Sequence, residues 1–248
     1  MEIALFSPSS LFVEEEEERD VEEADLQDHQ QYVERTHTFS GMLLTIREFS
    51  FHQFNANLLW PGTFVFGEWL SENKHLLEGK HILELGSGTG ALAIFIRKSF
   101  GVDITTSDFD DKELEENIAH NCKINEVNVL PHIRHTWGED FPVSEPYWDL
   151  IIASDILLYV KQYSNLVKTL SFLLKSYKQN KSNELAGSSE IRRIVTVSGE
   201  ELQLQKPLFL MSWRRRIGGE EVSFFSSCED AGLVVKHIGS RVYCISHS

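Results

Sequence analysis

The chain has 248 residues and a formal net charge of −15, with 42% hydrophobic and 25% charged residues. This length can bury one large core, and the composition is ordinary for a soluble globular protein. No apolar run reaches the length of a membrane span, and the first residues lack the pattern of a signal peptide. The three cysteines have no metal-ligand spacing, which predicts reduced thiols and no metal site; they are Cys122, Cys228 and Cys244.

The first segment of the chain is strongly acidic. Residues 1–35 contain twelve acidic and two basic residues, so they carry −10 of the net charge. We expect residues 1–36 to form a disordered acidic arm, and docking to a basic protein is the functional alternative. The one basic cluster, Arg214–Arg216, is too small to imply nucleic-acid binding, and the overall negative charge opposes it.

A lead-in over residues 37–79 follows the arm, and we predict that it belongs to a single domain over residues 37–248. Phe39–Phe54 alternates apolar and polar side chains, which predicts one or two strands in a hairpin-like arrangement. Trp60–Gly62 comes next. Thr63–Leu76 then has apolar side chains at helical spacing, which predicts an amphipathic helix.

Strands and helices alternate through the rest of the chain, which predicts an α/β fold with a doubly wound, mostly parallel sheet. The last two strands lie too close together for a parallel crossover, so we expect an antiparallel pair. Residues 178–190 are polar and predict a flexible surface insertion. The predicted strands are His81–Leu85, Val102–Thr106, Val129–Arg134, Leu150–Ser154, Ile191–Ser198, Leu233–Ile238 and Val242–Ile245. The predicted helices are Ala91–Phe100, Asp111–Ile124, Tyr163–Tyr177 and Glu220–Ala231.

The first strand of this series runs into three glycines, with the sequence Ile-Leu-Glu-Leu-Gly-Ser-Gly-Thr-Gly over residues 82–90. A strand that ends in glycines before a helix brings bare backbone N–H groups against a ligand, because no Cβ holds the ligand away. Glu84 lies in the strand, two residues before Gly86. The Gly-x-Gly-x-Gly spacing differs from the Gly-x-Gly-x-x-Gly of dinucleotide folds. A nucleoside cofactor is the functional interpretation, and a tight turn is the structural one.

A carboxylate ends the second predicted strand. Asp108 comes 22 residues after Gly86, where it can accept hydrogen bonds from both ribose hydroxyls of an adenosine. NAD and S-adenosylmethionine share that ribose, so Asp108 alone does not separate them. The glycine spacing and Glu84 favour the second, because together they resemble motif I of the S-adenosylmethionine-dependent methyltransferases. That resemblance implies S-adenosyl-L-methionine as cofactor and a seven-stranded, Rossmann-like sheet that closes with a C-terminal antiparallel hairpin.

A second candidate element follows the fourth predicted strand. Trp148–Asp155 is an apolar segment that ends in a carboxylate, and Tyr159 comes four residues later. Ligands bind outside the carboxyl ends of the strands in open α/β sheets, so we expect Asp155 beside Gly86 and Asp108. An acid and a phenol there could receive and orient a substrate amine. The structural alternatives are a helix N-cap for Asp155 and a core or rim aromatic for Tyr159.

Three elements together resemble the seven-strand protein methyltransferases called family 16, which are mainly lysine N-methyltransferases: Leu59–Gly62, Thr136–Gly138 and the Asp-x-x-Tyr element. The resemblance covers residue 39 to the end of the chain. The resemblance implies Asp155 and Tyr159 as catalytic residues. Trp137 would flank the adenine, with core packing as the alternative for Trp60 and Trp137. The implied cofactor-binding residues are Trp60, Glu84, Gly86, Ser87, Gly88, Asp108, Trp137 and Ser154.

Related enzymes that methylate amides or base amines carry Asn/Asp-Pro-Pro-Tyr/Phe after the fourth strand. Ser154–Leu157 has no proline, which favours an sp³ amine. We therefore predict an S-adenosylmethionine-dependent N-methyltransferase that acts on a protein lysine side chain. The alternatives are a methyltransferase of arginine, histidine or a small-molecule amine, and a non-catalytic interaction module. We expect a monomer in the cytoplasm, with the nucleus as a further compartment, and a protein substrate, for which a basic protein is the candidate, rather than nucleic acid or a membrane.

Overall fold

The computed structural model describes residues 32–178, 192–197, 199–213, 219–239 and 241–247. Three predicted features lie outside these residues: the acidic arm up to residue 31, the insertion from residue 179 onward, and Arg214–Arg216. No helix in the described ranges is both long and apolar enough to cross a bilayer. The same ranges contain no group of three or more His, Cys, Asp and Glu placed to hold a metal ion.

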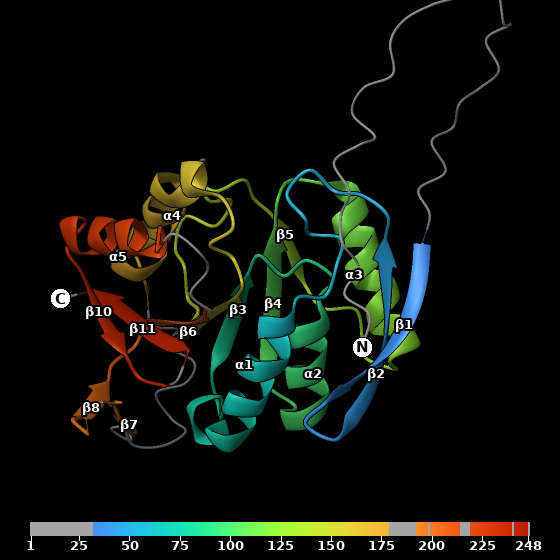
Figure 1. Cartoon of the computed structure of the whole chain (residues 1–248), viewed down its shortest axis with the longest axis horizontal. Helices are drawn as coiled ribbons and strands as arrows, with labels where there is room; N and C mark the ends of the chain where they lie inside the picture. Colours follow the sequence, from blue (N-terminus) through green and yellow to red (C-terminus); the bar gives the residue numbers. More distant parts are fainter. Residues whose placement is uncertain (1–31, 179–191, 198, 214–218, 240, 248) are drawn as a thin grey trace, which may run out of the picture. The chain divides into compact units, whose positions relative to one another are not determined.

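The central sheet has seven strands: β3 (His81–Leu85), β4 (Asp103–Asp108), β5 (His132–Arg134), β6 (Leu150–Ser154), β9 (Leu208–Ser212), β10 (Leu233–His237) and β11 (Val242–His247). Their order is β10-β11-β9-β6-β3-β4-β5 (Figure 1). The strands from β9 to β5 are parallel, and β11 runs antiparallel to both of its neighbours. The predicted α/β fold, a doubly wound and mostly parallel seven-stranded sheet with a C-terminal antiparallel hairpin, is confirmed.

The prediction of one strand of the main sheet is wrong. The sequence predicts Ile191–Ser198 in the main sheet, but β7 (Arg192–Val195) pairs with β8 (Glu201–Leu204) in a separate two-stranded sheet. The place beside β6 belongs to β9, whose five residues are all buried. A strand buried on both faces shows no alternation of polar and apolar residues. Exposure alternates along residues 193–197, where Ile194 and Thr196 are buried and their neighbours are exposed, as in a hairpin with one face in solvent.

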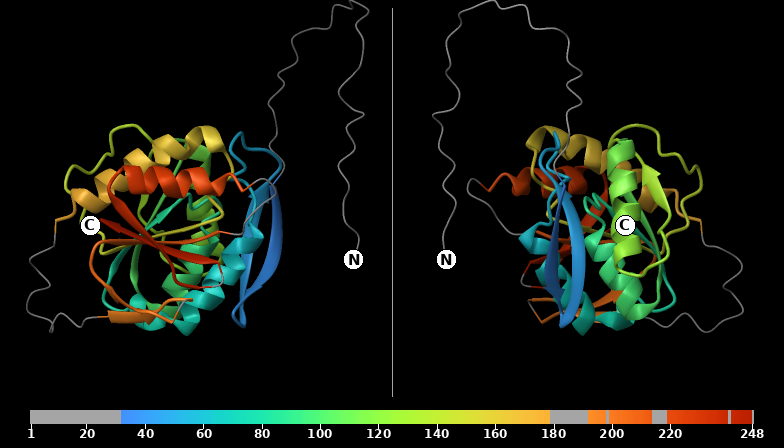
Figure 2. Two further views of the ribbon diagram at one scale, coloured as in Figure 1. Left: turned by 60° about the vertical axis from the view of Figure 1, so that its left-hand side comes forward. Right: turned by 90° about the vertical axis from the view of Figure 1, so that its right-hand side faces the viewer.

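Helices cover both faces of the central sheet: α1 (Pro61–Glu72), α2 (Ala91–Phe100), α3 (Lys112–Ile124), α4 (Tyr163–Lys175) and α5 (Glu221–Asp230), with the short helices η2 (Lys74–Leu76) and η3 (Val160–Gln162). Alternate strand residues point to opposite faces. Ile82 and Ile152 pack with α1 and α2, whereas Leu83 and Ile151 pack with α4 and α5. Figure 2 shows α4 and α5 side by side, away from α1 and α2. The predicted helices are confirmed to within a few residues at their ends.

An antiparallel hairpin, β1 (Tyr32–Phe39) and β2 (Met42–Phe49), precedes the sheet and lies beside α3 (Figure 1). The hairpin begins at Tyr32, so the predicted boundary at residue 37 is too late, and residues 32–36 belong to β1. The first five residues of β1 are exposed and are held by pairing with β2 rather than by burial. Their polar composition therefore continues that of the acidic arm, which is why the sequence does not separate them.

Three buried asparagines at every fourth position of α3 and its C-terminal end join the hairpin to the rest of the fold: Asn117, Asn121 and Asn125. Their side-chain amides bond the backbone of Thr45 and Arg47 along the free edge of β2. Asn121 also donates to the Thr89 carbonyl at 2.9 Å. The same side chain therefore contacts both the hairpin and the loop that follows β3.

Candidate functional site

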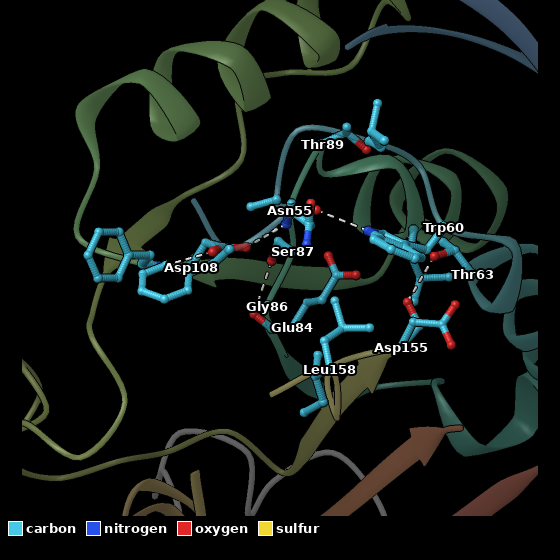
Figure 3. A pocket seen from close by; sticks show the side chains of 18 of the residues that line it. Asn55, Trp60, Thr63, Glu84, Gly86, Ser87, Thr89, Asp108, Asp155 and Leu158 are labelled. Atoms are coloured by element: carbon cyan, nitrogen blue, oxygen red, sulfur yellow. Dashed lines mark hydrogen bonds between the residues drawn. The ribbon is translucent and has the colours of Figure 1, made fainter. Parts of the chain in front are cut away.

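A pocket with about 900 Å³ of space opens at the carboxyl ends of β3, β4 and β6. The chain leaves β3 toward one face of the sheet and β6 toward the other, and open α/β sheets bind ligands at such a switch point. All ten residues that the sequence analysis assigns to the site line this pocket: Trp60, Glu84, Gly86, Ser87, Gly88, Asp108, Trp137, Ser154, Asp155 and Tyr159. Figure 3 labels Trp60, Glu84, Gly86, Ser87, Asp108 and Asp155 among them.

Gly86 is where the chain leaves β3, and the backbone conformation and the space there both favour glycine. Its φ of +65° lies in the left-handed region, which favours glycine. A Cβ at this position would lie 2.7 Å from Cγ2 of Ile156 and 3.5 Å from Cζ2 of Trp137. The glycine therefore keeps open the space between the loop after β3, the segment after β6 and Trp137.

Asp108 closes the loop after β3 from the neighbouring strand. Its Oδ2 accepts a hydrogen bond of 2.6 Å from the Gly88 N–H, and its Oδ1 accepts one of 2.7 Å from the Phe109 N–H. Burial raises the pKa of Asp108, and these two backbone donors oppose the rise. Each oxygen keeps a further lone pair, so the carboxylate can still accept hydroxyl donors from a ligand in the pocket.

Glu84 carries a buried acceptor that the rest of the described chain leaves unused. Its side chain is buried and lines the pocket. Its Oε2 has no hydrogen-bond partner among the described residues. Burial raises the pKa of Glu84 to about 8, against the lowering effect of a hydrogen bond from Ser87. A buried carboxyl oxygen without a partner is costly, so this atom marks a position where a donor from a ligand would be stabilising.

The remaining predicted cofactor residues reach the pocket in different ways. The Ser87 hydroxyl donates to the Glu84 carbonyl at 3.1 Å and accepts from the Ser107 backbone N–H of β4, so it joins the end of β3 to β4 while the residue lines the pocket. The Ser154 hydroxyl lies 3.0 Å from that of Thr63. Trp60 stands at the start of α1, half-buried, with its indole N–H on the Asn55 carbonyl at 3.0 Å.

The Asp155 carboxylate lies on the first turn of α1. Asp155 is buried, has a φ of +53°, and accepts a 2.7 Å hydrogen bond from the Gly62 N–H. A Cβ on Gly62 would come within 2.6 Å of that carboxylate, so glycine is required at the contact. The start of α1 has no side-chain cap of its own, and Asp155 supplies an acceptor there. The capping alternative therefore applies to α1, not to the helices after Asp155, whose N-termini have no side-chain cap bond.

Tyr159 lies at the rim of the pocket, half-buried. Its hydroxyl accepts a hydrogen bond of 2.5 Å from the Asn55 side-chain amide. Its ring meets the Phe54 ring edge-on, with 6.0 Å between centroids. The phenol therefore stands between the segment after β6 and the loop that joins β2 to α1.

Several residues that line the pocket have no place in the predicted site, among them Phe54, Asn55, Thr63, Phe109 and His135. Three of them sit next to motif residues, since Thr63 follows Gly62, Phe109 follows Asp108 and His135 precedes Trp137 by two positions. That adjacency was a usable signal. Phe54 and Asn55 come from a loop without a recognisable pattern, and only the fold brings them to the pocket.

Comparison with known proteins gives a family match over most of the described chain. A family model described as lysine methyltransferase matches residues 39–193. The chain is 28% identical to histone-arginine methyltransferase METTL23 of Xenopus laevis over 49% of this chain and 53% of that protein. It is 24% identical to protein N-terminal and lysine N-methyltransferase efm7 of Aspergillus fumigatus over 57% of this chain and 60% of the relative. The chain thus spans between about half and three fifths of the length of these curated relatives.

A further relative and a solved structure agree with this match. The chain is 30% identical to the human electron transfer flavoprotein beta subunit lysine methyltransferase over 40% of this chain and 36% of that protein. Its fold is similar to the T. thermophilus 16S rRNA methyltransferase RsmC, solved with AdoMet and guanosine, with a TM-score of 0.56 and 13% identity over 88% of this chain and 51% of that one. At that identity the likeness concerns the fold alone.

Proposed function

The chain belongs to the lysine methyltransferase family, and on that premise we propose that it methylates the side-chain nitrogen of a protein lysine. Its cofactor is S-adenosylmethionine. One observation carries the proposal: the residues that the family resemblance assigns to cofactor and substrate, from five separate segments of the chain, line a single pocket. The names of the relatives give different substrates, so the residues of this site carry the proposal of a lysine.

The pocket fits the cofactor at both of its ends. The turn at Gly86, which a side chain would fill, leaves room for the ligand at the end of β3. The Asp108 carboxylate would hold the ribose hydroxyls, and Trp137 would flank the adenine. The unpartnered Oε2 of Glu84 would accept from the ammonium group of the methionine part.

The cofactor supplies a methyl group already activated by the sulfonium charge. The chain therefore has to bring the substrate nitrogen into line with that methyl group, and such positioning can be worth about 7–11 kcal/mol in favourable systems. The lysine must be neutral to attack, whereas its ordinary pKa is about 10.4. Removal from water beside a positive charge lowers that pKa. Asp155 would hold the arriving ammonium group, Tyr159 would orient the neutral amine, and the proton would leave to solvent.

The chemistry at the end of β6 favours lysine over the alternatives. Ser154–Leu157 has no proline, unlike the enzymes that act on planar amide or base nitrogens. Arginine, histidine and small-molecule amines are the rival acceptors, and a non-catalytic module is the rival outside enzymes. The charge of −10 on the first 35 residues favours a basic protein as substrate and opposes nucleic acid. We propose a monomer that works in the cytoplasm, with the nucleus as a further compartment.

Incubation with S-[methyl-³H]adenosylmethionine and a protein extract tests the proposal. We expect tritium in a protein band with the natural chain and none with Gly86→Arg, because the arginine side chain would fill the space beside Ile156. Calorimetry with S-adenosylhomocysteine accompanies the assay and is expected to show binding that the substitution removes. Tritium confined to small molecules would favour a metabolite amine. Cofactor binding without any transfer would favour the non-catalytic module.

A further inference from the structure

The loop between β2 and α1, residues 50–60, lines the pocket and is held in shape from within. The Asn57 side-chain amide donates to the last carbonyl of β2 at 2.7 Å. The Nδ1 of His52 accepts from the backbone N–H groups of Phe54 at 3.2 Å and Ala56 at 3.3 Å. These bonds close the loop on itself, so the residues at its tip meet the pocket in a defined conformation.

Asn55 stands at the tip of this loop with a φ of +55°, a conformation that asparagine tolerates better than most residues. Its backbone carbonyl accepts from the Trp60 indole N–H at 3.0 Å, as Figure 3 shows. Its side-chain amide donates to the Tyr159 hydroxyl. One residue therefore bonds both a predicted cofactor residue and a predicted catalytic residue.

Tyr159 is restrained at three points, and Asn55 provides the one at the hydroxyl. The Gln162 N–H donates to the Tyr159 carbonyl at 2.9 Å, and the Phe54 ring packs edge-on against the phenol ring. A phenol oxygen has two acceptor lone pairs and one donor proton. Because the Asn55 amide occupies one lone pair, the other lone pair and the O–H bond are left in a fixed direction.

We propose that Asn55 is a positioning residue for methyl transfer, which acts through Tyr159 by fixing the hydroxyl that receives an N–H of the substrate amine. The inference rests on the proposed function. An amine that donates an N–H to a fixed acceptor has fewer directions open to its own lone pair. In-line displacement depends on that alignment, and small misplacements reduce the rate strongly. A residue that served only the turn of the loop would have no effect that depends on the Tyr159 hydroxyl.

Asn55→Gly separates these roles, because glycine keeps the left-handed turn and removes the amide. We expect the rate of tritium transfer to the labelled protein band to fall about 10-fold, with the Kd of S-adenosylhomocysteine within about 3-fold of the natural value. In the Tyr159→Phe background the same change is expected to have no further effect, because the hydroxyl is already absent. Gln53→Gly is the matched control, since Gln53 is exposed in the same loop and does not line the pocket.

Equal losses from Asn55→Gly with and without the Tyr159 hydroxyl would overturn the proposal, as would an equal loss from Gln53→Gly. A second measurement needs no activity: 3-fluorotyrosine at position 159 gives a ¹⁹F resonance that reports the hydrogen bond to the phenol. We expect Asn55→Gly to shift this resonance and Gln53→Gly to leave it in place, and an unmoved resonance in Asn55→Gly contradicts the inference. If the natural chain labels no protein, the proposed function fails, while the ¹⁹F result still decides whether Asn55 holds the hydroxyl.

Discussion

Asp155 occupies a position that serves structure and chemistry at once. Its Oδ2 is bonded to the Gly62 N–H at the start of α1, and the residue also lines the pocket near Tyr159. The hydrogen bond to α1 needs an acceptor oxygen, whereas holding an ammonium group needs negative charge. The two tasks can therefore be separated by a substitution that keeps the oxygen and removes the charge.

Asp155→Asn is that substitution, and asparagine also tolerates the positive φ of this position. We expect methyl transfer to fall at least about 100-fold, the low end of what a positioned polar group contributes, with a melting temperature close to that of the natural chain. Asp155→Ala should lose transfer and also about 1 kcal/mol of stability, because α1 loses its acceptor. Single-turnover rates beside melting curves check both variants. Near-natural transfer by Asp155→Asn would leave the residue with the structural task alone.

Glu84 is expected to couple cofactor binding to the release of a proton. Because burial raises its pKa to about 8, the carboxyl group is mostly protonated at pH 7 in the free protein. An ammonium group of the ligand beside Oε2 would stabilise the charged form, so we expect binding of S-adenosylhomocysteine at pH 7 to release up to one proton. Calorimetry in buffers of different ionisation enthalpy measures the number released. Glu84→Gln should remove the release, and an unchanged release in that variant would assign the proton to another group.

At the scale of elements, the asparagines of α3 connect the N-terminal hairpin to the loop after β3. Asn121 bonds both β2 and the Thr89 carbonyl, whereas Asn125 bonds β2 and its own helix. Loss of Asn121 or Asn125 leaves a half-buried backbone N–H of the hairpin without its acceptor, that of Arg47 or that of Thr45 respectively. Only the loss of Asn121 also frees the loop after β3.

We therefore expect Asn121→Ala and Asn125→Ala each to reduce the free energy of unfolding by roughly 1–3 kcal/mol. Only Asn121→Ala should also weaken the binding of S-adenosylhomocysteine, because of these two asparagines only Asn121 bonds the loop after β3, at the Thr89 carbonyl. Urea unfolding and calorimetry on both variants provide the comparison. Equal affinities of the two variants for S-adenosylhomocysteine would mean that the loop after β3 keeps its conformation without its link to the hairpin.

The sequence predicts most elements because their signals are local. The glycines end β3, and Gly101 in the left-handed conformation ends α2, so both boundaries are predicted correctly. The strand β9 is missed because its apolar run, Leu208–Met211, is short and continuous, which does not distinguish a buried strand from a buried helix. Four of the residues 193–197 are β-branched, which favours a strand, and this run therefore takes its place in the prediction.

In the site, too, the features that depend on local sequence are predicted, and the contacts between distant segments are not. The strand ends at Gly86, Asp108 and Asp155 are visible in the sequence, and parallel strands bring their carboxyl ends to one edge. The contact of Asp155 with Gly62 joins positions 93 residues apart, and that of Asn55 with Tyr159 joins positions 104 residues apart. No local pattern encodes such contacts, because they arise only when α1 and the loop before it are packed against the sheet.

At the scale of the whole molecule, Asp149 ties together the edge of the sheet opposite the pocket. Its carboxylate accepts from the Tyr177 hydroxyl at 2.6 Å, the Lys206 ammonium group at 2.9 Å and the His81 N–H at 3.2 Å. Burial opposes ionisation, but these donors outweigh it and lower the pKa of Asp149 below its usual value. The beginnings of β3, β6 and β9 therefore share one charged acceptor.

A lowered folded-state pKa gives stability that is present above the unfolded pKa and lost as the pH falls through the folded one. We expect Asp149→Asn to reduce the free energy of unfolding by roughly 1–3 kcal/mol at pH 7. The difference from the natural chain should shrink as the pH falls below about 4. Urea unfolding across this range tests it, with Asp103→Asn as the control because its carboxylate is largely exposed. A difference that stays constant down to pH 2 would show that Asp149 acts through packing.

If this pocket delivers a methyl group to a protein, as we propose, the identity of the modified atom shows whether the acceptor is a lysine. The measurement is fragment-ion mass spectrometry of the protein modified in an extract with S-adenosylmethionine that carries a CD₃ group. We expect CD₃ on the side-chain nitrogen of a lysine, absent when Gly86→Arg replaces the natural chain. CD₃ on an arginine guanidinium, on a histidine ring or only on small molecules would contradict it.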